Sequence, residues 1–178
     1  MEAYQGVDLL LDAFKLAVEK RGGGLHLILI GGLPQDIESY EQRSERLGLK
    51  ESVFFIGPRA FDQLSEYLAG ADILVSPRIS GINTPMKIFP FLHSGKPVLA
   101  TDLPTHSQIL TGGVACLAPA EPVQFAEALL ELSKDAELRL RLGQAGRAFV
   151  ESNHTFAAHR KRLDRAYDWI EMQLEGSH

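Results

Sequence analysis

The feature that most restricts the fold of this sequence is a repeated alternation of short apolar runs with helical segments. Five apolar runs of strand length occur, at residues 25–32, 52–56, 72–76, 97–100 and 114–118. Runs of this kind are typical of parallel strands that are buried on both faces. Parallel neighbours need a right-handed crossover helix between them. The alternation therefore predicts an α/β fold with a doubly wound, Rossmann-like parallel sheet.

Helical periodicity fills the intervals between the apolar runs and continues beyond the last one. We expect helices at residues 7–19, 36–47, 61–69, 85–93, 122–132, 137–151 and 156–174. The last two are extra C-terminal helices. The final helix carries an apolar stripe that consists of Leu163, Ala166, Tyr167, Ile170 and Leu174. This stripe needs a surface to cover, either this sheet or a partner, so a dimer through this helix is one expectation.

Composition limits the class of protein. The 178 residues, 45% of them hydrophobic, are enough for one core, and we assign residues 1–175 to one domain and 176–178 to a cloning remnant. The net charge of −5 with dispersed basic residues predicts no nucleic-acid partner. No apolar run reaches the roughly 20 residues of a membrane span. The single cysteine, Cys116, lies in an apolar run, which suits a core position and a reducing cytoplasm.

The stretch from Ser76 to His106 has the pattern expected at a binding site. It joins two apolar runs through an irregular loop, in which Thr84 offers a helix N-cap and Pro85 stands at the first helical position. In an open α/β sheet, such a loop lies at the carboxyl end of a strand and above a helix N-terminus. This is the usual place for an anionic ligand, and we expect a phosphate group there.

Other ligand chemistries find less support. No cluster of histidine, cysteine and carboxylate residues has metal-ligand spacing, so we expect no metal site. A Walker loop and a G-x-G-x-x-G motif after the first apolar run are both absent, which disfavours an ATPase and a dehydrogenase.

Several blocks of the sequence, taken in order, resemble the donor-binding half of group 1 (family 4) retaining glycosyltransferases of the GT-B architecture. The blocks are YQGVDLLLDAF, LHLILIGG, VFFIGPRAFDQLSEYLAGADILVSPR, NTPMKIF, SGKPVLATDLPTH and LRLGQAGRAFV. The resemblance implies that residues 1–175 bind a nucleoside-diphosphate sugar without a cofactor or metal. It also implies that the acceptor domain and the first strand of the donor domain are missing from this sequence.

The same resemblance implies a cytoplasmic enzyme of glycan biosynthesis that moves a sugar to an acceptor hydroxyl. The acceptor, a glycan or a lipid, would be held by the missing domain, which leaves peripheral membrane association open. The isolated fragment would bind the donor without transferring the sugar.

The site residues follow from the family motifs. Pro85-Met86-Lys87 matches a P-x-K motif found in a branch of the family, so Lys87 is expected to face the donor diphosphate and to stabilise the leaving group. The Thr84 hydroxyl and the amides of Met86 and Lys87 would complete the cradle, in the loop that contains Asn83.

Further contacts are implied at two glycine turns and two arginines. Backbone at Gly57 and Pro58 corresponds to the region that contacts the nucleobase, and Gly31-Gly32 to a turn near the sugar diphosphate. Either turn could also need glycine for its tight geometry alone. Arg59 and Arg78 could supply positive charge to the donor or could be ordinary surface residues.

The sequence departs from the family at three positions. The two glutamates that the family places with seven residues between them correspond to Ile82 and Pro90, and Gln5 stands where many relatives carry a lysine. The second glutamate commonly accepts hydrogen bonds from the donor ribose, which proline cannot do. Proline in the second turn should also kink or shorten the helix.

These departures leave two rival interpretations open. One is a non-catalytic glycosyltransferase-like scaffold or interaction module, and the other is an epimerase that acts on the nucleotide sugar itself. In the resembled transferases, His106 of the LPTH segment could be a catalytic base, but retaining enzymes of this type are not thought to need one from this domain, so a structural role is the stronger expectation.

Overall fold

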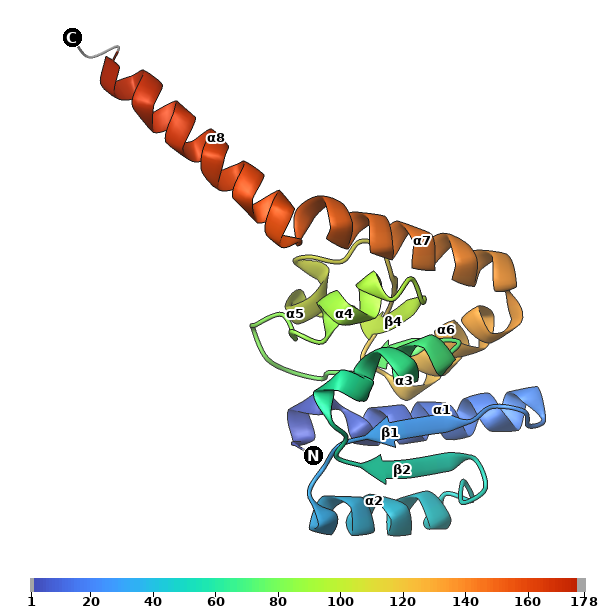
Figure 1. Ribbon diagram of the computed structural model, residues 1–178. Coiled ribbons are helices and arrows are strands. Elements are labelled where there is room, and N and C mark those ends of the chain that lie inside the picture. The colour runs from blue at the N-terminus through green and yellow to red at the C-terminus, as the bar shows by residue number, and fades with distance from the viewer. Residues whose placement is uncertain (1, 176–178) are drawn as a thin grey trace.

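The computed structural model describes residues 2–175, so the expected remnant at 176–178 lies outside the described residues. The strands are β1 (Leu27–Ile30), β2 (Val53–Gly57), β3 (Leu74–Ser76), β4 (Val98–Thr101) and β5 (Cys116–Ala118). The helices are α1 (Val7–Arg21), α2 (Pro34–Arg46), α3 (Leu64–Gly70), α4 (Ile88–His93), α5 (Pro104–Ser107), α6 (Pro122–Lys134), α7 (Ala136–Asn153) and α8 (Phe156–Glu175) (Figure 1). Two 3₁₀ turns, η1 (Ala3–Gln5) and η2 (Phe61–Gln63), precede α1 and α3.

All strand pairs within the described residues are parallel, and helices flank them, which confirms the α/β, Rossmann-like class. The strands form two blocks. One block pairs β1 with β2, and the other has the order β3-β4-β5. Among residues 2–175, no strand bridges β1 and β3, so each of these two strands has one unpaired edge.

The larger hydrophobic core lies where α1 packs against α6. Leu10, Phe14 and Ala17 of α1 are buried, as the helical spacing predicts, and Phe125 and Leu130 of α6 are buried in the same cluster. A second buried cluster joins α4 and α7 to the β3-β4-β5 block. The two clusters hold the helices that position the loop after β3.

β1 differs from the prediction of a strand buried on both faces. Leu27 is buried, but Ile28 and Ile30 are 55% and 43% exposed. This run therefore contains more apolar side chains than are buried among residues 2–175. The exposed residues alternate with Leu27 and Leu29, and successive side chains of a strand point to opposite faces, so one face of β1 is left uncovered.

α4 begins three residues later than the expected start at Pro85. Pro85–Ile88 form a turn in which the Ile88 amide donates to the Pro85 carbonyl at 3.0 Å. Starting at Ile88 places Pro90 in the first helical turn, where a missing N–H costs no helical hydrogen bond. The helix is thus short, as Pro90 predicts, but the expectation of Pro85 at the first helical position is wrong.

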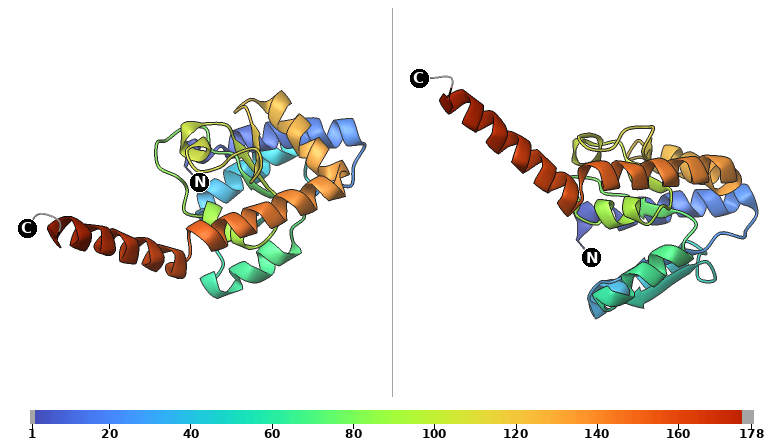
Figure 2. Two further views of the ribbon diagram at one scale, coloured as in Figure 1. Left: turned by 90° about the horizontal axis from the view of Figure 1, so that it is seen from above. Right: turned by 45° about the horizontal axis from the view of Figure 1, so that its top comes forward.

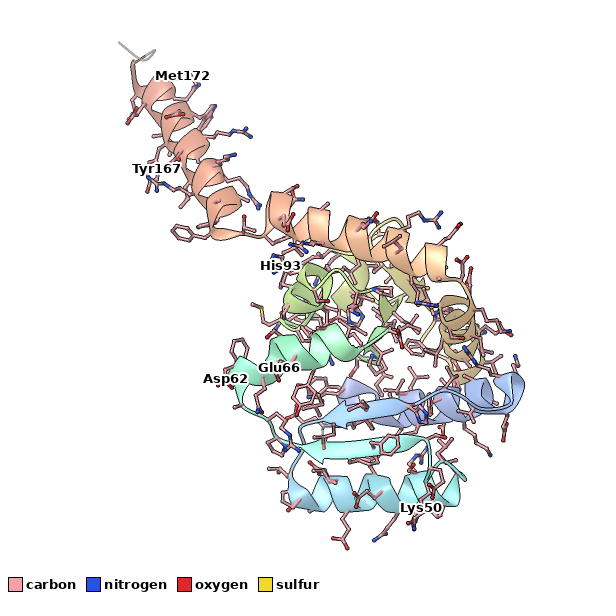
Figure 3. All side chains as sticks on the ribbon, turned by 45° about the vertical axis from the view of Figure 1, so that its right-hand side comes forward. Lys50, Asp62, Glu66, His93, Tyr167 and Met172 are labelled. Atoms are coloured by element: carbon pink, nitrogen blue, oxygen red, sulfur yellow. The ribbon has the colours of Figure 1, made fainter. Side chains whose placement is uncertain are left out.

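α8 projects away from the rest of the molecule (Figures 1 and 2). Its apolar side chains are solvent-exposed, and Tyr167 and Met172 lie far from the body of the protein (Figure 3). The apolar stripe of this helix therefore does not cover the sheets, one of the two surfaces expected for it.

Candidate functional site

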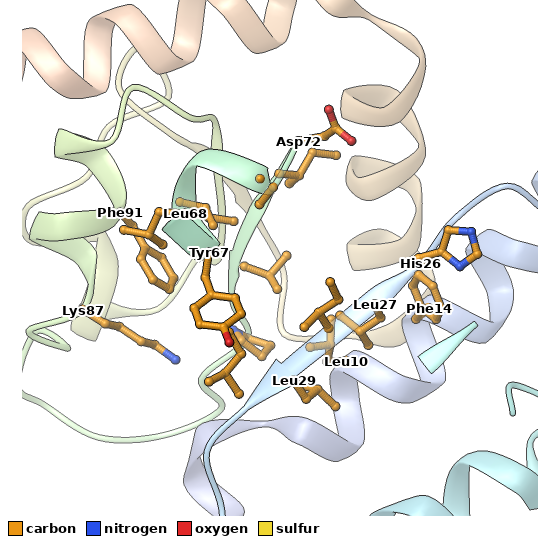
Figure 4. A pocket seen from close by; sticks show the side chains of 18 of the residues that line it. Leu10, Phe14, His26, Leu27, Leu29, Tyr67, Leu68, Asp72, Lys87 and Phe91 are labelled. Atoms are coloured by element: carbon orange, nitrogen blue, oxygen red, sulfur yellow. The ribbon is translucent and has the colours of Figure 1, made fainter. Parts of the chain in front are cut away.

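A pocket with a volume of about 1450 Å³ lies between the two strand blocks. α1 and β1 supply one group of lining side chains, and α3, β3 and α4 supply the other (Figure 4). Most of the lining is apolar. The polar lining near the carboxyl ends of the strands combines the donors Lys87, Arg59, Tyr67 and Gln5 with the carboxylates Glu2 and Asp36.

Lys87 lines this pocket, and its side chain points into it (Figure 4). Its side chain keeps an exposed surface but lies in a concave, densely surrounded position. Desolvation by these surroundings lowers the pKa of Lys87, and the positive charge of Arg78 lowers it further. Both causes disfavour the ammonium form, and an anion in the pocket would favour it.

Arg78 holds the loop between β3 and α4. Its Nε donates to the Ser80 carbonyl at 2.9 Å, and its Nη1 donates to the Asn83 carbonyl at 2.8 Å and to the Thr105 hydroxyl at 3.4 Å. The Nε and Nη1 donors of Arg78 are therefore already bonded to other groups of the protein. In the described structure, Arg78 shapes the loop and contributes positive charge at a distance to Lys87.

The N-terminal segment supports the same loop. The Arg78 guanidinium lies over the Tyr4 ring, with Cζ 4.7 Å from the ring centroid, and the Ile79 amide donates to the Tyr4 carbonyl at 2.9 Å. Gly6 packs so closely that a Cβ there would lie 1.8 Å from the Pro77 carbonyl oxygen. Only glycine fits this contact.

Residues around α5 support the loop from below. The Thr105 hydroxyl donates to the Asn83 carbonyl at 2.7 Å, and the Thr101 hydroxyl donates to the Arg78 carbonyl at 2.5 Å. The Gln108 amide donates to the Thr84 hydroxyl at 2.6 Å. Thr84 therefore bonds to Gln108 in place of the expected helix cap.

His106 is fully buried beneath this network. Its Nδ1 donates to the Thr101 carbonyl at 3.0 Å, which leaves Nε2 to accept the Ser76 hydroxyl at 2.9 Å. Burial lowers the pKa of His106, and the charges of Lys87 and Arg78 lower it further, against the opposing effect of the Thr101 hydrogen bond. A buried, neutral and hydrogen-bonded imidazole confirms the structural role expected from the sequence.

Arg59 lies on the other side of the pocket mouth. Its Nε donates to the Tyr67 hydroxyl at 3.1 Å and its Nη1 to the Pro58 carbonyl at 3.0 Å. The guanidinium remains exposed, with donors to spare. The pair places a cation and a phenol among the residues that line the pocket with Lys87.

The residues expected to bind the donor divide into two groups. Lys87, Arg59 and Gly32 line the pocket. The others lie around it in the two glycine turns and the loop but are not among its lining residues: Gly31, Gly57, Pro58, Arg78, Asn83, Thr84, Pro85 and Met86. Met86 points into solvent with 77% of its surface exposed.

The two positions of the family glutamates also lie outside the main pocket. Ile82 is 83% exposed, and Pro90 lines a separate shallow depression with His93 and His154. Neither side chain can accept a hydrogen bond.

Sequence reasoning missed Tyr67, Thr105 and Gln108. Tyr67 has the helical spacing of a core residue, so its hydroxyl gave no separate signal. Thr105 and Gln108 act through contacts more than 20 positions away along the chain, and only the fold brings them to the loop.

The described part of the chain contains no group of three or more histidine, cysteine, aspartate or glutamate residues that could hold a metal ion. Within residues 2–175 there is also no helix that is both long enough and apolar enough to cross a membrane.

The fold and this pocket define a Rossmann-like domain in which Lys87 and Arg59 line a pocket near the carboxyl ends of parallel strands, the position at which this class binds its ligands. The family model for group 1 glycosyl transferases matches residues 1–135, so the chain belongs to this family.

Individual relatives agree with this assignment. A phosphatidyl-myo-inositol mannosyltransferase of Mycobacterium leprae is 28% identical over 170 residues, which are 94% of this chain and 40% of the relative. A D-inositol 3-phosphate glycosyltransferase of Corynebacterium diphtheriae is 25% identical over 175 residues, with the same two coverages. The chain thus spans about two fifths of the length of these relatives.

Solved structures share the fold. Anabaena Alr3699/HepE in complex with UDP is similar with a TM-score of 0.80 and 21% identity, over 94% of this chain and 46% of that protein. The C-terminal domain of the group 1 glycosyl transferase LpcC from Francisella tularensis is similar with a TM-score of 0.76 and 21% identity. That likeness covers 88% of this chain and 83% of the LpcC domain.

Proposed function

We propose that this chain is the donor-binding half of a retaining glycosyltransferase that moves a sugar from a nucleoside-diphosphate sugar to an acceptor hydroxyl. The observation that carries the proposal is the Lys87 ammonium, which reaches into the pocket at the carboxyl ends of the strands (Figure 4). Membership of the group 1 family supports it, as does the similar fold of a protein solved with UDP.

In this proposal, Lys87 neutralises the diphosphate and stabilises the charge that develops on the leaving nucleoside diphosphate. The six-residue α4 contributes little by its dipole, so recognition of the anion depends mainly on this side chain. Arg59 and the loop amides at Met86 and Lys87 assist it. Gly31, Gly32, Gly57 and Pro58 bring backbone close to the rest of the nucleotide, and no metal or cofactor is required.

The proposal extends to the acceptor, the location of the protein and its self-association. The acceptor, a glycan or a lipid, is held by a second domain, so the isolated chain binds the donor and transfers nothing. The protein works in the cytoplasm, and α8 gives it a surface for dimer formation.

Calorimetric titration with UDP tests the donor site, with uridine as the matched ligand that lacks the diphosphate. We expect UDP to bind more tightly than uridine. We expect Lys87→Met to weaken UDP binding by about tenfold to a hundredfold, as for loss of one charge-assisted hydrogen bond of about 1.5–3 kcal/mol. Lys50→Met serves as the control, because Lys50 pairs with Glu45 on the surface near α2 (Figure 3). No heat with UDP, together with no protection of residues 78–87 from hydrogen exchange, would contradict the proposal.

A non-catalytic, glycosyltransferase-like module is the second candidate function. Ile82 and Pro90 favour it, because neither can make the hydrogen bonds of the family glutamates. Incubation of the complete parent protein with UDP-sugar and candidate acceptors separates the two. Retained UDP binding without sugar transfer or donor hydrolysis would establish the module.

A further inference from the structure

The loop between β3 and α4, residues 77–87, contains no helix or strand. Residues 79–83 are exposed, so few buried contacts hold this part of the loop. An exposed segment without a helix or a strand ladder keeps one conformation only where specific hydrogen bonds fix its backbone. Lys87 ends the loop, and its position therefore depends on the bonds that hold the residues before it.

Three consecutive residues of this loop are bonded to α5 and to the residue that follows it. The Thr105 hydroxyl donates to the Asn83 carbonyl at 2.7 Å. The side-chain amide of Gln108 donates to the Ile82 carbonyl at 3.3 Å and to the Thr84 hydroxyl at 2.6 Å. One short helical segment thus fixes the centre of the loop.

Thr105 is the completely buried member of this set. Nη1 of Arg78 donates to the Thr105 hydroxyl at 3.4 Å and to the Asn83 carbonyl at 2.8 Å, and the Thr105 hydroxyl donates to the same carbonyl. The three groups form a closed triangle of hydrogen bonds. Removal of the hydroxyl breaks two sides of this triangle, and burial keeps water from replacing the lost bonds.

We propose that Thr105 is a positioning residue of the anion site: its hydroxyl fixes Asn83, and the fixed loop holds the Lys87 ammonium where a diphosphate can meet it. This inference rests on the proposed donor site. A loop that is already ordered loses little conformational freedom when the ligand binds, so its order contributes to affinity. Thr105 does not line the pocket, and it therefore acts through the loop without touching the ligand.

Two substitutions at this position separate the hydroxyl group from the packing of the side chain. Thr105→Val keeps the shape and removes the hydroxyl, whereas Thr105→Ser keeps the hydroxyl and removes a methyl group. In calorimetric titrations, we expect Thr105→Val to weaken UDP binding by about threefold to tenfold and Thr105→Ser by less than about twofold, as for loss of one hydrogen bond in the first variant alone. The affinity for uridine, which lacks the diphosphate, should be the same in both variants.

Coupling to Lys87 distinguishes positioning from general stabilisation. In the Lys87→Met background, Thr105→Val should change the affinity for UDP by less than about twofold, because its effect runs through the ammonium group. Hydrogen exchange of residues 79–87 should be faster in Thr105→Val than in the wild-type chain, while exchange in β4 should stay the same.

Two further variants complete the design. Gln108→Met removes the amide from an exposed side chain, so the core stays intact, and it should also weaken UDP binding more than uridine binding. Thr155→Val is the matched control, because the Thr155 hydroxyl also donates to a backbone carbonyl, that of Glu151 at 3.2 Å, but lies outside the main pocket. This control should leave UDP affinity unchanged.

Three results would overturn the inference. Weaker UDP binding in Thr105→Ser than in Thr105→Val would assign the effect to packing. An equal loss from Thr105→Val with and without Lys87 would show that the loop does not act through the ammonium group. Equal UDP affinities in the wild-type chain and both Thr105 variants would remove the inference alone, whereas a wild-type chain that does not bind UDP contradicts the proposed function itself.

Discussion

The Ser76 hydroxyl lies 2.9 Å from Nε2 of His106, and this hydrogen bond joins the end of β3 to the helix that supports the binding loop. Both side chains are completely buried. The loop that carries Lys87 therefore rests on a buried polar network whose state depends on the protonation of one imidazole.

Protonation of His106 should destabilise the fold. Its folded-state pKa is lowered by burial and by nearby positive charge, so the unfolded chain binds the proton more readily. Stability should be fully present above the unfolded pKa of about 6.5 and should fall as the pH drops below it. Urea unfolding at pH 7.5 and pH 5.5 measures this loss, which His106→Asn should reduce. We expect this variant to be less stable at pH 7.5 by about 1–3 kcal/mol. An unchanged pH dependence in the variant would contradict the prediction.

Gly6→Ala should disturb the binding loop, because the new Cβ would overlap the Pro77 carbonyl. Gly22→Ala is a matched control, since Gly22 has a similar φ of 79° against 74° and a Cβ added there would meet no atom within 4 Å. Both variants should lose about 1–2 kcal/mol through the left-handed backbone conformation. Gly6→Ala should lose about 1–3 kcal/mol more through overpacking. Urea denaturation measures the difference, and equal losses would show that the contact can relax freely.

Lys87 should titrate below the other lysines, because desolvation and Arg78 both disfavour its charged form. A bound diphosphate favours the ammonium, so UDP should raise this pKa again. NMR of lysines carrying ¹³C-methyl groups measures both shifts, with Lys87→Arg used to assign the signal. A Lys87 signal that titrates with the exposed lysines and does not respond to UDP would place this side chain outside the anion site.

The α8 stripe should mediate self-association of the isolated chain. Leu163→Glu combined with Ile170→Glu should convert any dimer to monomer and leave the melting temperature nearly unchanged, because both side chains are already solvent-exposed. Arg165→Glu lies on the opposite face of the helix and should have no effect. Sedimentation equilibrium measures the outcome. A dimer that persists in the double variant, or a wild-type chain that stays monomeric at high concentration, would exclude this interface.

Much of the architecture follows from local patterns. The spacing of Leu10, Phe14 and Ala17 predicts the buried face of α1, and the five apolar runs predict all five strands. The start of α4 could not be predicted, because Thr84 and Pro85 have the composition of a helix start. The hydrogen bond from Gln108 to Thr84, made across 24 residues, uses the hydroxyl expected to cap that helix.

The candidate site was predicted less completely than the fold. The short motif at Lys87 led to the expectation that this side chain faces a ligand, and Lys87 does line the pocket. The role of Arg78 could not, because its partners include Thr105, 27 residues away. The exposure of Ile28 and Ile30 also escaped prediction, since an apolar run indicates what a strand can bury and carries no information about whether both of its faces are covered.

Through the contact of Tyr4 with Arg78, the first few residues influence the position of the binding loop although the segment is short. The segment ahead of α1 packs against the loop that carries Lys87, so a displacement of this segment would also displace the loop. An affinity tag or fusion partner placed before residue 4 would therefore alter ligand binding. The C-terminus is the better attachment point for binding measurements.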